Sequence, residues 1–323
     1  MLGQNLSKLH LSDIFSARQR LPRAFSKTPL LSSELLNLQV KANLYLKAES
    51  LQPSGAYKIR GAYNKCAYLV EQHGSRLSII TASSGNHGMA CAMAAAKLGI
   101  CAKVVVPVST PEIKKNCIRS LGAELIEHGE TYDESFQRAC QLTEQEKEIY
   151  YVHPVSDTQV LGGQGTIGLE ILEQLPSVQQ VVIPLGGGGL ATGISYCLKQ
   201  IFPQIRIICV MPKGSAVYVE SRKAGELVEL PYCASMADAV VRKTGEPFLY
   251  PYLETYVDEI VTVSEASIAA AIQDAALYAK LTLEGAGALP LAAVKEGVIQ
   301  NDLCTVLICS GGNIDRESLK NVL

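Results

Sequence analysis

The 323-residue sequence predicts an α/β fold of doubly wound, open parallel sheets with helices on both faces. Two observations carry this prediction. Short apolar runs recur along the chain without polar residues at every second position, and segments of helical length separate them. Strands that are buried on both faces of a parallel sheet have this continuous apolar character. The expected strands are 43–49, 77–81, 103–107, 124–128, 149–153, 180–185, 206–211 and 304–310.

Helix start signals lie between several of these runs. Thr110 offers an N-cap with Pro111 at the first helical position, and Ser264 opens another expected helix in the same manner. Residues 75–149 hold three strand–helix alternations, which predicts a small domain inserted into a larger one. The expected domains are therefore a small domain, 75–149, and a large domain made of 1–74 and 150–323.

The composition is that of an ordinary globular protein, with 48% hydrophobic residues, 19% charged residues and a formal net charge of −2. Its basic residues are scattered, so we expect neither a nucleic acid nor a membrane as partner. No apolar stretch approaches the length of a membrane span, and none resembles the core of a signal peptide. The ten cysteines form no CxxC pair, which favours free thiols in a reducing cytoplasm over disulfides or zinc ligands.

Lys58 stands at the start of an expected helix that runs towards Leu69, directly after the loop 54–57. A cation at a helix N-terminus is disfavoured by the helix dipole. The same field favours the neutral amine that Schiff-base chemistry with a carbonyl requires. Position alone favours an ordinary solvated lysine, so a catalytic role depends on the neighbouring motifs.

A second loop, 81–88, combines hydroxyl and amide side chains before an alanine-rich helix. Ser83, Ser84 and Asn86, together with the free backbone N–H groups of a helix start, would suit a carboxylate. The same residues would also serve as an ordinary helix cap. His87 by itself is better interpreted as a hydrogen-bonded structural residue than as a base.

Four consecutive glycines, Gly186, Gly187, Gly188 and Gly189, separate an expected strand from a helix that reaches Lys199. Such a run is costly in chain entropy and requires a reason. A strand, a glycine loop and a helix N-terminus together form a phosphate cradle, because glycine lets backbone amides approach the anion. The alternative is a simple tight turn.

The last expected strand ends in the loop 309–313, which contains Ser310. A polar group at this place can point into the crevice at the carboxyl ends of the strands, where open α/β sheets bind ligands. The pattern G-x-G-x-x-G at 163–168 is a decoy, because no convincing strand precedes it and no suitable acidic residue follows a second strand. Binding of NAD is therefore disfavoured.

These four loops, in this order, resemble those of fold-type II pyridoxal-phosphate (PLP) enzymes, most closely the threonine dehydratase and serine racemase family. The resemblance implies a fold similar to the β subunit of tryptophan synthase, and it covers nearly the whole chain. It includes the residues that trail Lys58, Arg60-Gly61-Ala62. Further matching stretches are 27–30, His153-Pro154, 163–171, 236–238, Glu284 with 286–288, and 310–313.

The resemblance implies a role for each loop. Lys58 would carry PLP as a Schiff base and then move the α-proton of the substrate. Asn86 would hydrogen-bond the pyridoxal 3′-oxygen, Ser310 would face the pyridine nitrogen, and Gly186 to Gly189 would hold the phosphate. The substrate carboxylate site would be lined by Ser83, Ser84, Asn86 and His87. A neutral serine at the pyridine nitrogen makes the ring a weaker electron sink, which favours prompt loss of a β-hydroxyl.

The implied reaction is the elimination of water from L-threonine or L-serine, which gives a 2-oxo acid and ammonia. The alternative is a serine racemase with side dehydratase activity, because Ser84 matches the second catalytic acid/base of the racemases. Met211, however, stands where their metal loop offers a glutamate, and Lys213 discourages a divalent cation, so we expect no metal. Phe136 replaces an arginine of similar racemases, which favours an apolar β-substituent such as that of threonine.

Two further interpretations are weaker. A non-catalytic PLP-binding protein would be free to lose Lys58, Ser84, Asn86 and Ser310, yet all four are present. An oxidoreductase lacks a convincing dinucleotide loop. The chain ends about ten residues after the Ser310 loop, so we expect no regulatory domain and a catabolic role. The resemblance suggests a homodimer or homotetramer, and it leaves threonine, serine and 3-hydroxyaspartate open as substrates.

Overall fold

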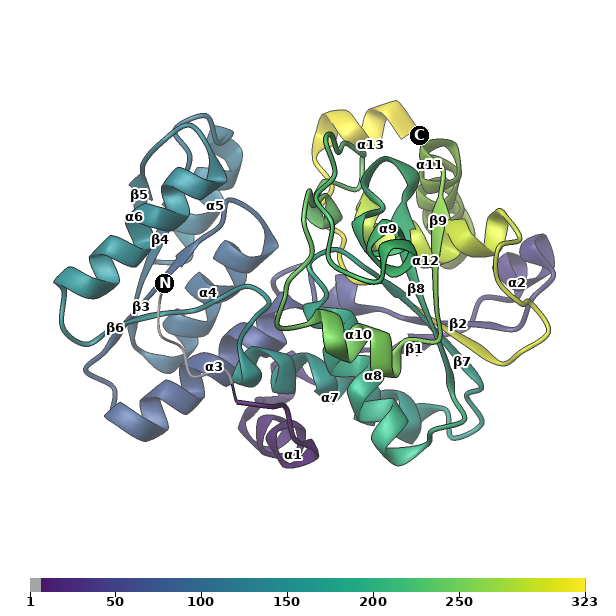
Figure 1. Ribbon diagram of the computed structural model, residues 1–323, viewed down its shortest axis with the longest axis horizontal. Coiled ribbons are helices and arrows are strands. Elements are labelled where there is room, and N and C mark those ends of the chain that lie inside the picture. Colours follow the sequence, from purple (N-terminus) through teal and green to yellow (C-terminus); the bar gives the residue numbers. More distant parts are fainter. Residues whose placement is uncertain (1–6, 323) are drawn as a thin grey trace. The chain divides into compact units, whose positions relative to one another are not determined.

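The computed structural model describes residues 7–322 and confirms the α/β fold (Figure 1). The chain forms two compact units, each built around its own sheet. Unit 1 comprises residues 7–26 and Lys58–Gln164, and unit 2 comprises Lys27–Tyr57 and residues 165–322. The chain therefore passes from unit 2 to unit 1 at the peptide bond that precedes Lys58.

Unit 1 contains a parallel sheet of order β5-β4-β3-β6. Its strands are β3 (Ser78–Ala82), β4 (Cys101–Val106), β5 (Glu124–Glu127) and β6 (Ile149–Tyr151). Its helical segments are α1 (Leu11–Arg20), η1 (Arg23–Phe25), α3 (Lys58–His73), α4 (Asn86–Leu98), α5 (Glu112–Ser120) and α6 (Tyr132–Gln145). Helix α7 (Thr158–Gln174) begins in unit 1 and continues into unit 2.

Helices cover both faces of the unit 1 sheet, because successive side chains of a strand point to opposite faces. Ile79 and Val104 pack with α3, α4 and α5, whereas their neighbours Ile80 and Val105 pack with α6. The helix that begins with Lys58 therefore belongs to the core of this unit.

Unit 2 contains a sheet of order β1-β2-β10-β7-β8-β9, in which β1 runs antiparallel to β2 and the other neighbours are parallel. Its strands are β1 (Leu30–Leu31), β2 (Leu44–Lys47), β7 (Gln180–Pro184), β8 (Arg206–Pro212), β9 (Glu259–Val263) and β10 (Thr305–Ile308). Its α-helices are α2 (Glu34–Val40), α8 (Gly189–Ile201), α9 (Val217–Ala224), α10 (Tyr250–Tyr256), α11 (Glu265–Asp274), α12 (Gly285–Lys295) and α13 (Arg316–Val322). Short turns are η2 (Glu49–Leu51), η3 (Lys213–Ser215), η4 (Asp238–Val240) and the π-helical η5 (Ala275–Ala279).

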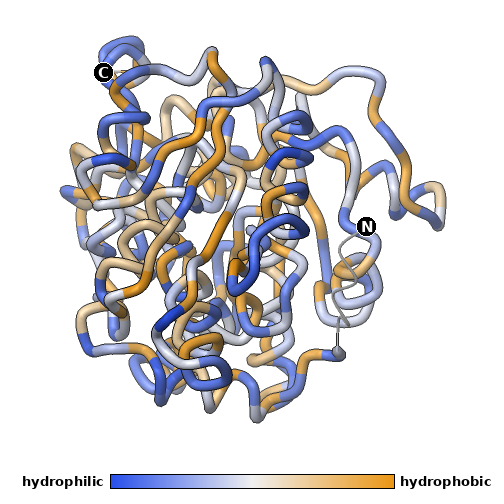
Figure 2. The backbone as a smooth tube through the Cα atoms, turned by 90° about the vertical axis from the view of Figure 1, so that its left-hand side faces the viewer, coloured by the Kyte–Doolittle hydropathy of each residue, from blue (hydrophilic) through white to orange (hydrophobic). Residues whose placement is uncertain are grey.

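The core of unit 2 also has two halves. Val182 and Leu307 pack with α11 and α12, whereas Val181 and Val306 pack with α7 and α8. Both faces of the central strands are thus buried, which explains their continuous apolar runs. Figure 2 shows these hydrophobic stretches alternating with hydrophilic ones along the backbone.

The expected strands are present, with ends that differ by a few residues. The sequence does not predict β1 and β9: β1 has two residues, and β9 is an edge strand in which only Val263 is fully buried. The expected N-cap at Thr110 is wrong, because Pro111 occupies the N-cap and α5 begins one residue later. Ser264 caps α11 as predicted, since its hydroxyl accepts a hydrogen bond from the Ser267 N–H.

The compact units have other bounds than the domains expected from element counting. Residues 58–73 lie in unit 1 because Ile59, Ala62 and Cys66 of α3 pack with α4. The expected domain bounds rest on strand–helix alternation, which does not reveal the partner of a helix. Assignment of PLP binding to the larger domain stays a prediction.

The G-x-G-x-x-G pattern lies inside α7 rather than between a strand and a helix. A Cβ added at Gly163 would lie 2.6 Å from the carbonyl oxygen of Arg60 and from Cα of Gly61. One added at Gly168 would lie 3.0 Å from the sulfur of Cys197. These glycines let α7 pack closely on its neighbours, which explains the pattern without a dinucleotide.

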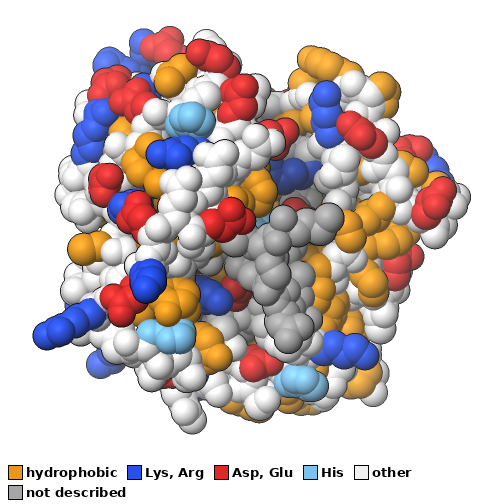
Figure 3. Space-filling model, turned by 60° about the vertical axis from the view of Figure 1, so that its left-hand side comes forward, with side chains coloured by type: hydrophobic (Ala, Val, Ile, Leu, Met, Phe, Trp, Pro, Cys, Tyr) orange, Lys and Arg blue, Asp and Glu red, His pale blue; other side chains and the backbone are white. Residues whose placement is uncertain are grey.

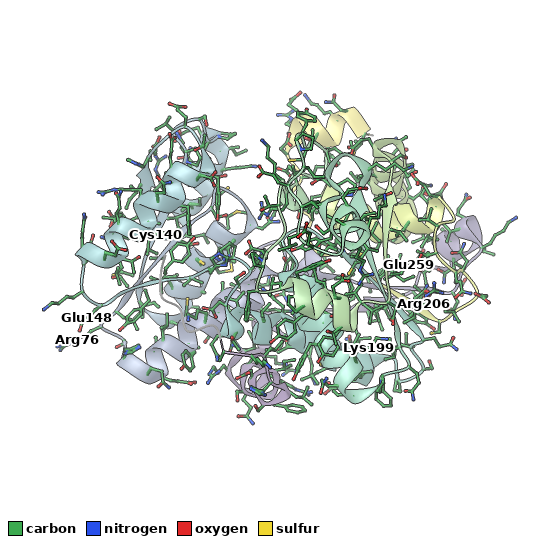
Figure 4. The ribbon with its side chains drawn as sticks, in the orientation of Figure 1. Arg76, Cys140, Glu148, Lys199, Arg206 and Glu259 are labelled. Carbon is green, nitrogen blue, oxygen red and sulfur yellow. The ribbon has the colours of Figure 1, made fainter. Side chains whose placement is uncertain are left out.

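None of the helices within residues 7–322 is long and apolar enough to cross a membrane. On the face drawn in Figure 3, acidic and basic side chains are interspersed. Two surface ion pairs near β8 and β9 show the same mixing: Lys199 Nζ lies 2.7 Å from Asp258, and Arg206 lies 2.7 Å from Glu259 (Figure 4). A continuous basic surface is not seen on that face.

The ten cysteines, all of which lie in the described part of the chain, are free thiols, as the sequence predicts. Cys101 and Cys117 are exposed. The other eight are buried or partly buried: Cys66, Cys91, Cys140, Cys197, Cys209, Cys233, Cys304 and Cys309. Burial raises the pKa of Cys197, Cys209 and Cys309 to about 12, so these thiols stay protonated at neutral pH.

Candidate active site

Lys58 is the first residue of α3, as the sequence predicts, and its side chain is half-buried. Its Nζ donates a hydrogen bond to the carbonyl oxygen of Pro154 at 2.8 Å. Pro154 follows β6, which pairs with β3 in a parallel ladder. Because parallel strands end at the same edge of a sheet, the loops after β3 and β6 leave that edge side by side. Lys58 therefore lies at the carboxyl edge of the unit 1 sheet, where open α/β sheets bind ligands.

Residues 83–87 connect β3 to α4, with Gly85 at the N-cap and Asn86 as the first helical residue. Ser83, Ser84 and Asn86 are half-buried, so a small ligand can approach them. The hydroxyl of Ser83 accepts a hydrogen bond from the Gly85 N–H at 3.3 Å. The first turn of α4 adds N–H groups that have no carbonyl partner within the helix, and the positive end of the helix dipole. This loop can therefore hold a carboxylate.

His87 lies beneath this loop and is 3% exposed. Its Nε2 is 3.0 Å from the carbonyl oxygen of Val152, and since a carbonyl only accepts, Nε2 carries the hydrogen. Burial, followed by the positive charge of Lys58, lowers the pKa of His87 from 6.5 to about 3. His87 is therefore neutral at pH 7 and joins α4 to the end of β6. Its expected place beside the substrate carboxylate stays a prediction.

The glycine loop follows β7 and leads into α8, whose N-cap is Gly188. Gly188 has a φ of +95°, a left-handed conformation that favours glycine. A Cβ added at Gly186 would lie 2.8 Å from Cα of Val240, so packing excludes a side chain there as well. The first N–H groups of α8 have no carbonyl partner within the helix. The loop can therefore hold an anion such as a phosphate.

The loop after β10 is hydrogen-bonded to the segment that leads to Lys58. The Tyr57 N–H donates to the carbonyl oxygen of Ser310 at 3.0 Å. Nδ2 of Asn313 donates to the carbonyl oxygen of Ser54 at 2.9 Å. Within unit 2, the structure thus joins the first and the fourth of the predicted loops. Since β10 pairs with β7, the Ser310 loop and the glycine loop also leave the same edge of one sheet.

Sequence reasoning missed two groups near these loops. The first is the carbonyl of Pro154, a backbone group that no residue pattern could signal. The second is the phenol of Tyr57, whose pKa is raised above its usual value, mainly by burial. The charge of Arg242 opposes this increase, and that of Glu284 adds to it. Its position directly before Lys58 is the signal that could have found it.

The three residues that were weighed for substrate choice or for a metal site have structural partners. Phe136 packs edge-to-face against Tyr151, with ring centroids 5.5 Å apart. Met211 is fully buried in β8, within the apolar cluster that covers one face of the unit 2 sheet. Lys213, which follows this strand, lies 3.5 Å from Glu296. The expected influence of these residues on substrate and metal stays a prediction.

Comparison with known proteins identifies the class. Residues 21–311 match the family described as pyridoxal-phosphate dependent enzyme, so the chain belongs to this family and is an enzyme that uses PLP. L-threonine ammonia-lyase of Thermotoga maritima is 37% identical, over 97% of this chain and 78% of that protein.

Two solved structures are similar over most of their length. The processed form of threonine deaminase isoform 2 from Solanum lycopersicum has a TM-score of 0.89 at 34% identity, covering 96% of this chain and 91% of that chain. Maize serine racemase has a TM-score of 0.91 at 30% identity, covering 98% and 97%. Both types of enzyme expected from the sequence are thus among its structural relatives.

The residues of this chain fit PLP. The glycine loop excludes side chains at Gly186 and Gly188 and lies at the start of a 13-residue helix, which suits the phosphate. Lys58 supplies a half-buried primary amine for a carbonyl. The buried Ser310 supplies a neutral hydroxyl for a ring nitrogen.

Proposed function

We propose that this enzyme eliminates water from L-threonine or L-serine and releases a 2-oxo acid and ammonia. The observation that carries the proposal is the half-buried amine of Lys58 at the same sheet edge as the hydroxyl-rich start of α4. The 37% identity with an L-threonine ammonia-lyase supports the reaction and the substrate class. In balance, the water lost at the β-carbon is regained in the hydrolysis that frees ammonia.

The residues that would hold the cofactor are those that the sequence predicts. We propose that Gly186 to Gly189 bind its phosphate, Asn86 its 3′-oxygen, Ser310 its ring nitrogen, and Lys58 its carbonyl carbon. When bound, PLP withdraws electrons from the α-carbon of an amino acid, which makes the α-proton acidic and weakens the bond to a β-hydroxyl. The glycine loop supports this assignment because it is shaped for an anion.

The side chains of unit 1 would orient the substrate and move its proton. Ser83, Ser84 and Asn86 would hold the carboxylate at the positive end of α4, with His87 neutral beneath them. The amine of Lys58 would take the proton from the α-carbon as a general base. Fixing the carboxylate aligns the α-carbon with that amine, which is the main contribution expected from the protein.

The test measures both the cofactor and the product. Purified protein with PLP should show a visible absorbance band that shifts on addition of L-threonine, and L-threonine should yield a 2-oxo acid with ammonia. Lys58→Ala should lose the band and the activity. Lys97→Ala, an exposed lysine of α4, should keep both. Retention of the band and of 2-oxo acid formation by Lys58→Ala would refute the proposal.

Serine racemisation is a second candidate. Ser84 is half-buried in the loop that would hold the substrate, and maize serine racemase is 30% identical. If Ser84 is the second acid/base, Ser84→Ala should stop formation of D-serine, whereas water elimination should only decrease because the carboxylate is held less well. Chiral analysis of recovered serine decides the matter, since wild-type protein that returns only L-serine is not a racemase.

We further propose a cytoplasmic homo-oligomer, a dimer or a tetramer. The ten free thiols support a reducing compartment. Sedimentation of the PLP-loaded protein tests the assembly, and a species with the mass of one chain would contradict it. A catabolic role stays a prediction.

A further inference from the structure

The turn between β6 and α7, residues 153–157, is largely buried and accepts a hydrogen bond from the side chain of Lys58. Nζ of Lys58 donates to the carbonyl oxygen of Pro154 at 2.8 Å. Pro154 is buried, and proline has no N–H, so its carbonyl is the polar group that this residue offers. The ammonium of Lys58 thus has an acceptor of fixed position in unit 1.

His153 gives this turn its shape. Its Nδ1 accepts hydrogen bonds from the backbone N–H groups of Val155 at 3.2 Å and of Ser156 at 2.7 Å. Because both partners are donors, Nδ1 carries no hydrogen. The imidazole therefore closes a small ring around Pro154, and this ring sets the direction in which the Pro154 carbonyl points.

Helix α3 is also bonded to the last residue of this turn and to the first turn of α7. Nζ of Lys65 lies 2.8 Å from Oδ2 of Asp157, and these side chains are 15% and 5% exposed. Nδ2 of Asn64 donates to the carbonyl oxygen of Gln159 at 2.7 Å. A change confined to His153 would leave both contacts in place. Its effect should therefore reach Lys58 without releasing α3.

We propose that His153 is a positioning residue that aims the Pro154 carbonyl at Lys58 and so holds its ammonium whenever Lys58 is not bonded to the cofactor. This inference rests on the proposed function only in taking Lys58 as the reactive lysine. A lysine that has taken up the α-proton must stay close to the substrate, so that this proton can pass to the departing β-hydroxyl and leave with it as water. A hydrogen bond from a charged donor is strong enough to restrain such a flexible side chain.

The test follows the reactivity of Lys58 in the full chain freed of PLP, so it requires neither substrate nor turnover. An amine-acylating reagent is added briefly, and peptide mass spectrometry measures the labelling rate of Lys58 relative to the exposed Lys97. His153→Leu removes the acceptor for both N–H groups, which should raise the Lys58 rate about tenfold. His153→Asn should restore it to within about twofold, because an asparagine oxygen accepts the same N–H groups in an Asx turn.

Thr131→Ala is the matched control. It removes the side-chain acceptor for the Glu134 N–H at the N-cap of α6 in unit 1, so it lowers stability while it leaves the hydrogen bonds of the turn in place and should leave the Lys58 rate unchanged. If His153→Leu does not fold, His153→Gln takes its place, since its longer side chain cannot repeat the Asx geometry. Equal labelling of Lys58 in wild type and the His153→Leu or His153→Gln variant would overturn the proposal. An increase in the Lys58 labelling rate that His153→Asn does not reverse would also overturn the proposal. A chain that follows the expected labelling but leaves threonine intact would instead refute the proposed substrate.

Discussion

The side chain of Asn313 lies against Gly55, and its Nδ2 holds the carbonyl oxygen of the preceding Ser54 at 2.9 Å. Gly55 has a φ of +74°. The Gly312 N–H donates in turn to the carbonyl oxygen of Gly55 at 2.9 Å. The segment that precedes Lys58 is therefore fixed on the loop that carries Ser310, within unit 2.

Gly55→Ala should destabilise the protein strongly, because a Cβ at this position overlaps the side chain of Asn313. Gly74→Ala is the control: its φ of +79° is similar, and an added Cβ meets no atom of the described chain within 4 Å. The control should lose about 1 kcal/mol to backbone strain alone, and Gly55→Ala about 2 kcal/mol more from overpacking. Urea unfolding measures both. Adding Asn313→Ala to Gly55→Ala should narrow the difference, and equal losses in the two single variants would contradict the contact.

Lys47→Met should cost about 3–5 kcal/mol of the free energy of unfolding, because it leaves a buried carboxylate without its charge partner. Lys47 is fully buried with its Nζ 2.6 Å from Glu170, and it also donates to the carbonyl oxygen of Thr28 at 2.8 Å. Adding Glu170→Leu removes the second charge and should recover most of the loss. Lys223→Met breaks the exposed pair with Glu220 and should cost less than about 1 kcal/mol. Similar losses for the two lysines in denaturant titrations would refute the argument.

The free energy of unfolding should decrease as the pH falls, because His87 is buried and neutral in the folded chain. The unfolded chain protonates this histidine near pH 6.5, whereas the folded chain keeps it neutral down to about pH 3. Between these values the unfolded state binds more protons, so the free energy of unfolding decreases as the pH falls. From pH 7 to pH 5 the loss should be about 2 kcal/mol. His87→Gln should flatten the slope, and His128→Gln, at an exposed histidine of the same unit, should retain it.

Gly163→Ala should destabilise unit 1 more than Gly162→Ala. An added Cβ at Gly163 would lie 2.6 Å from backbone atoms of α3, which cannot move away as the end of a side chain can. At Gly162 the nearest atom, the carbonyl oxygen of Asp13, would be 3.1 Å away. The expected costs are about 3 kcal/mol and about 1 kcal/mol. Thermal unfolding ranks the two, and the opposite order would exclude close helix packing as the reason for these glycines.

Much of the fold could be predicted because the central strands are buried on both faces and therefore read as unbroken apolar runs. Strand β9 could not, since its edge position leaves Glu259 and Thr262 partly exposed and interrupts the run. The helix that begins at Lys58 could also be predicted from the sequence, because a loop is followed there by residues at helical spacing. Its packing partner could not, because periodicity shows that a helix has an apolar face but not what covers it.

Likewise, some residues of the candidate site could be predicted from the sequence and others could not. Lys58, the glycine loop and Ser310 could be predicted because the four loops, in their order along the chain, together resemble those of a known enzyme family. Their partners could not, since the Pro154 carbonyl is 96 residues from Lys58 and a backbone group of any residue type. Asn313 and Ser54 are separated by 259 residues. Contacts of this kind follow from the path of the chain and require the structure.

The exposure of the cysteines differs along the chain, which should allow a fluorophore to be attached selectively to the wild-type protein. Cys101 and Cys117 are the fully exposed cysteines of the described chain, and both belong to unit 1. Cys197, Cys209 and Cys309 of unit 2 are shielded by burial and stay protonated. A maleimide fluorophore at neutral pH should therefore attach first to unit 1. Fluorescence could then report on one unit during cofactor uptake, without any engineered cysteine.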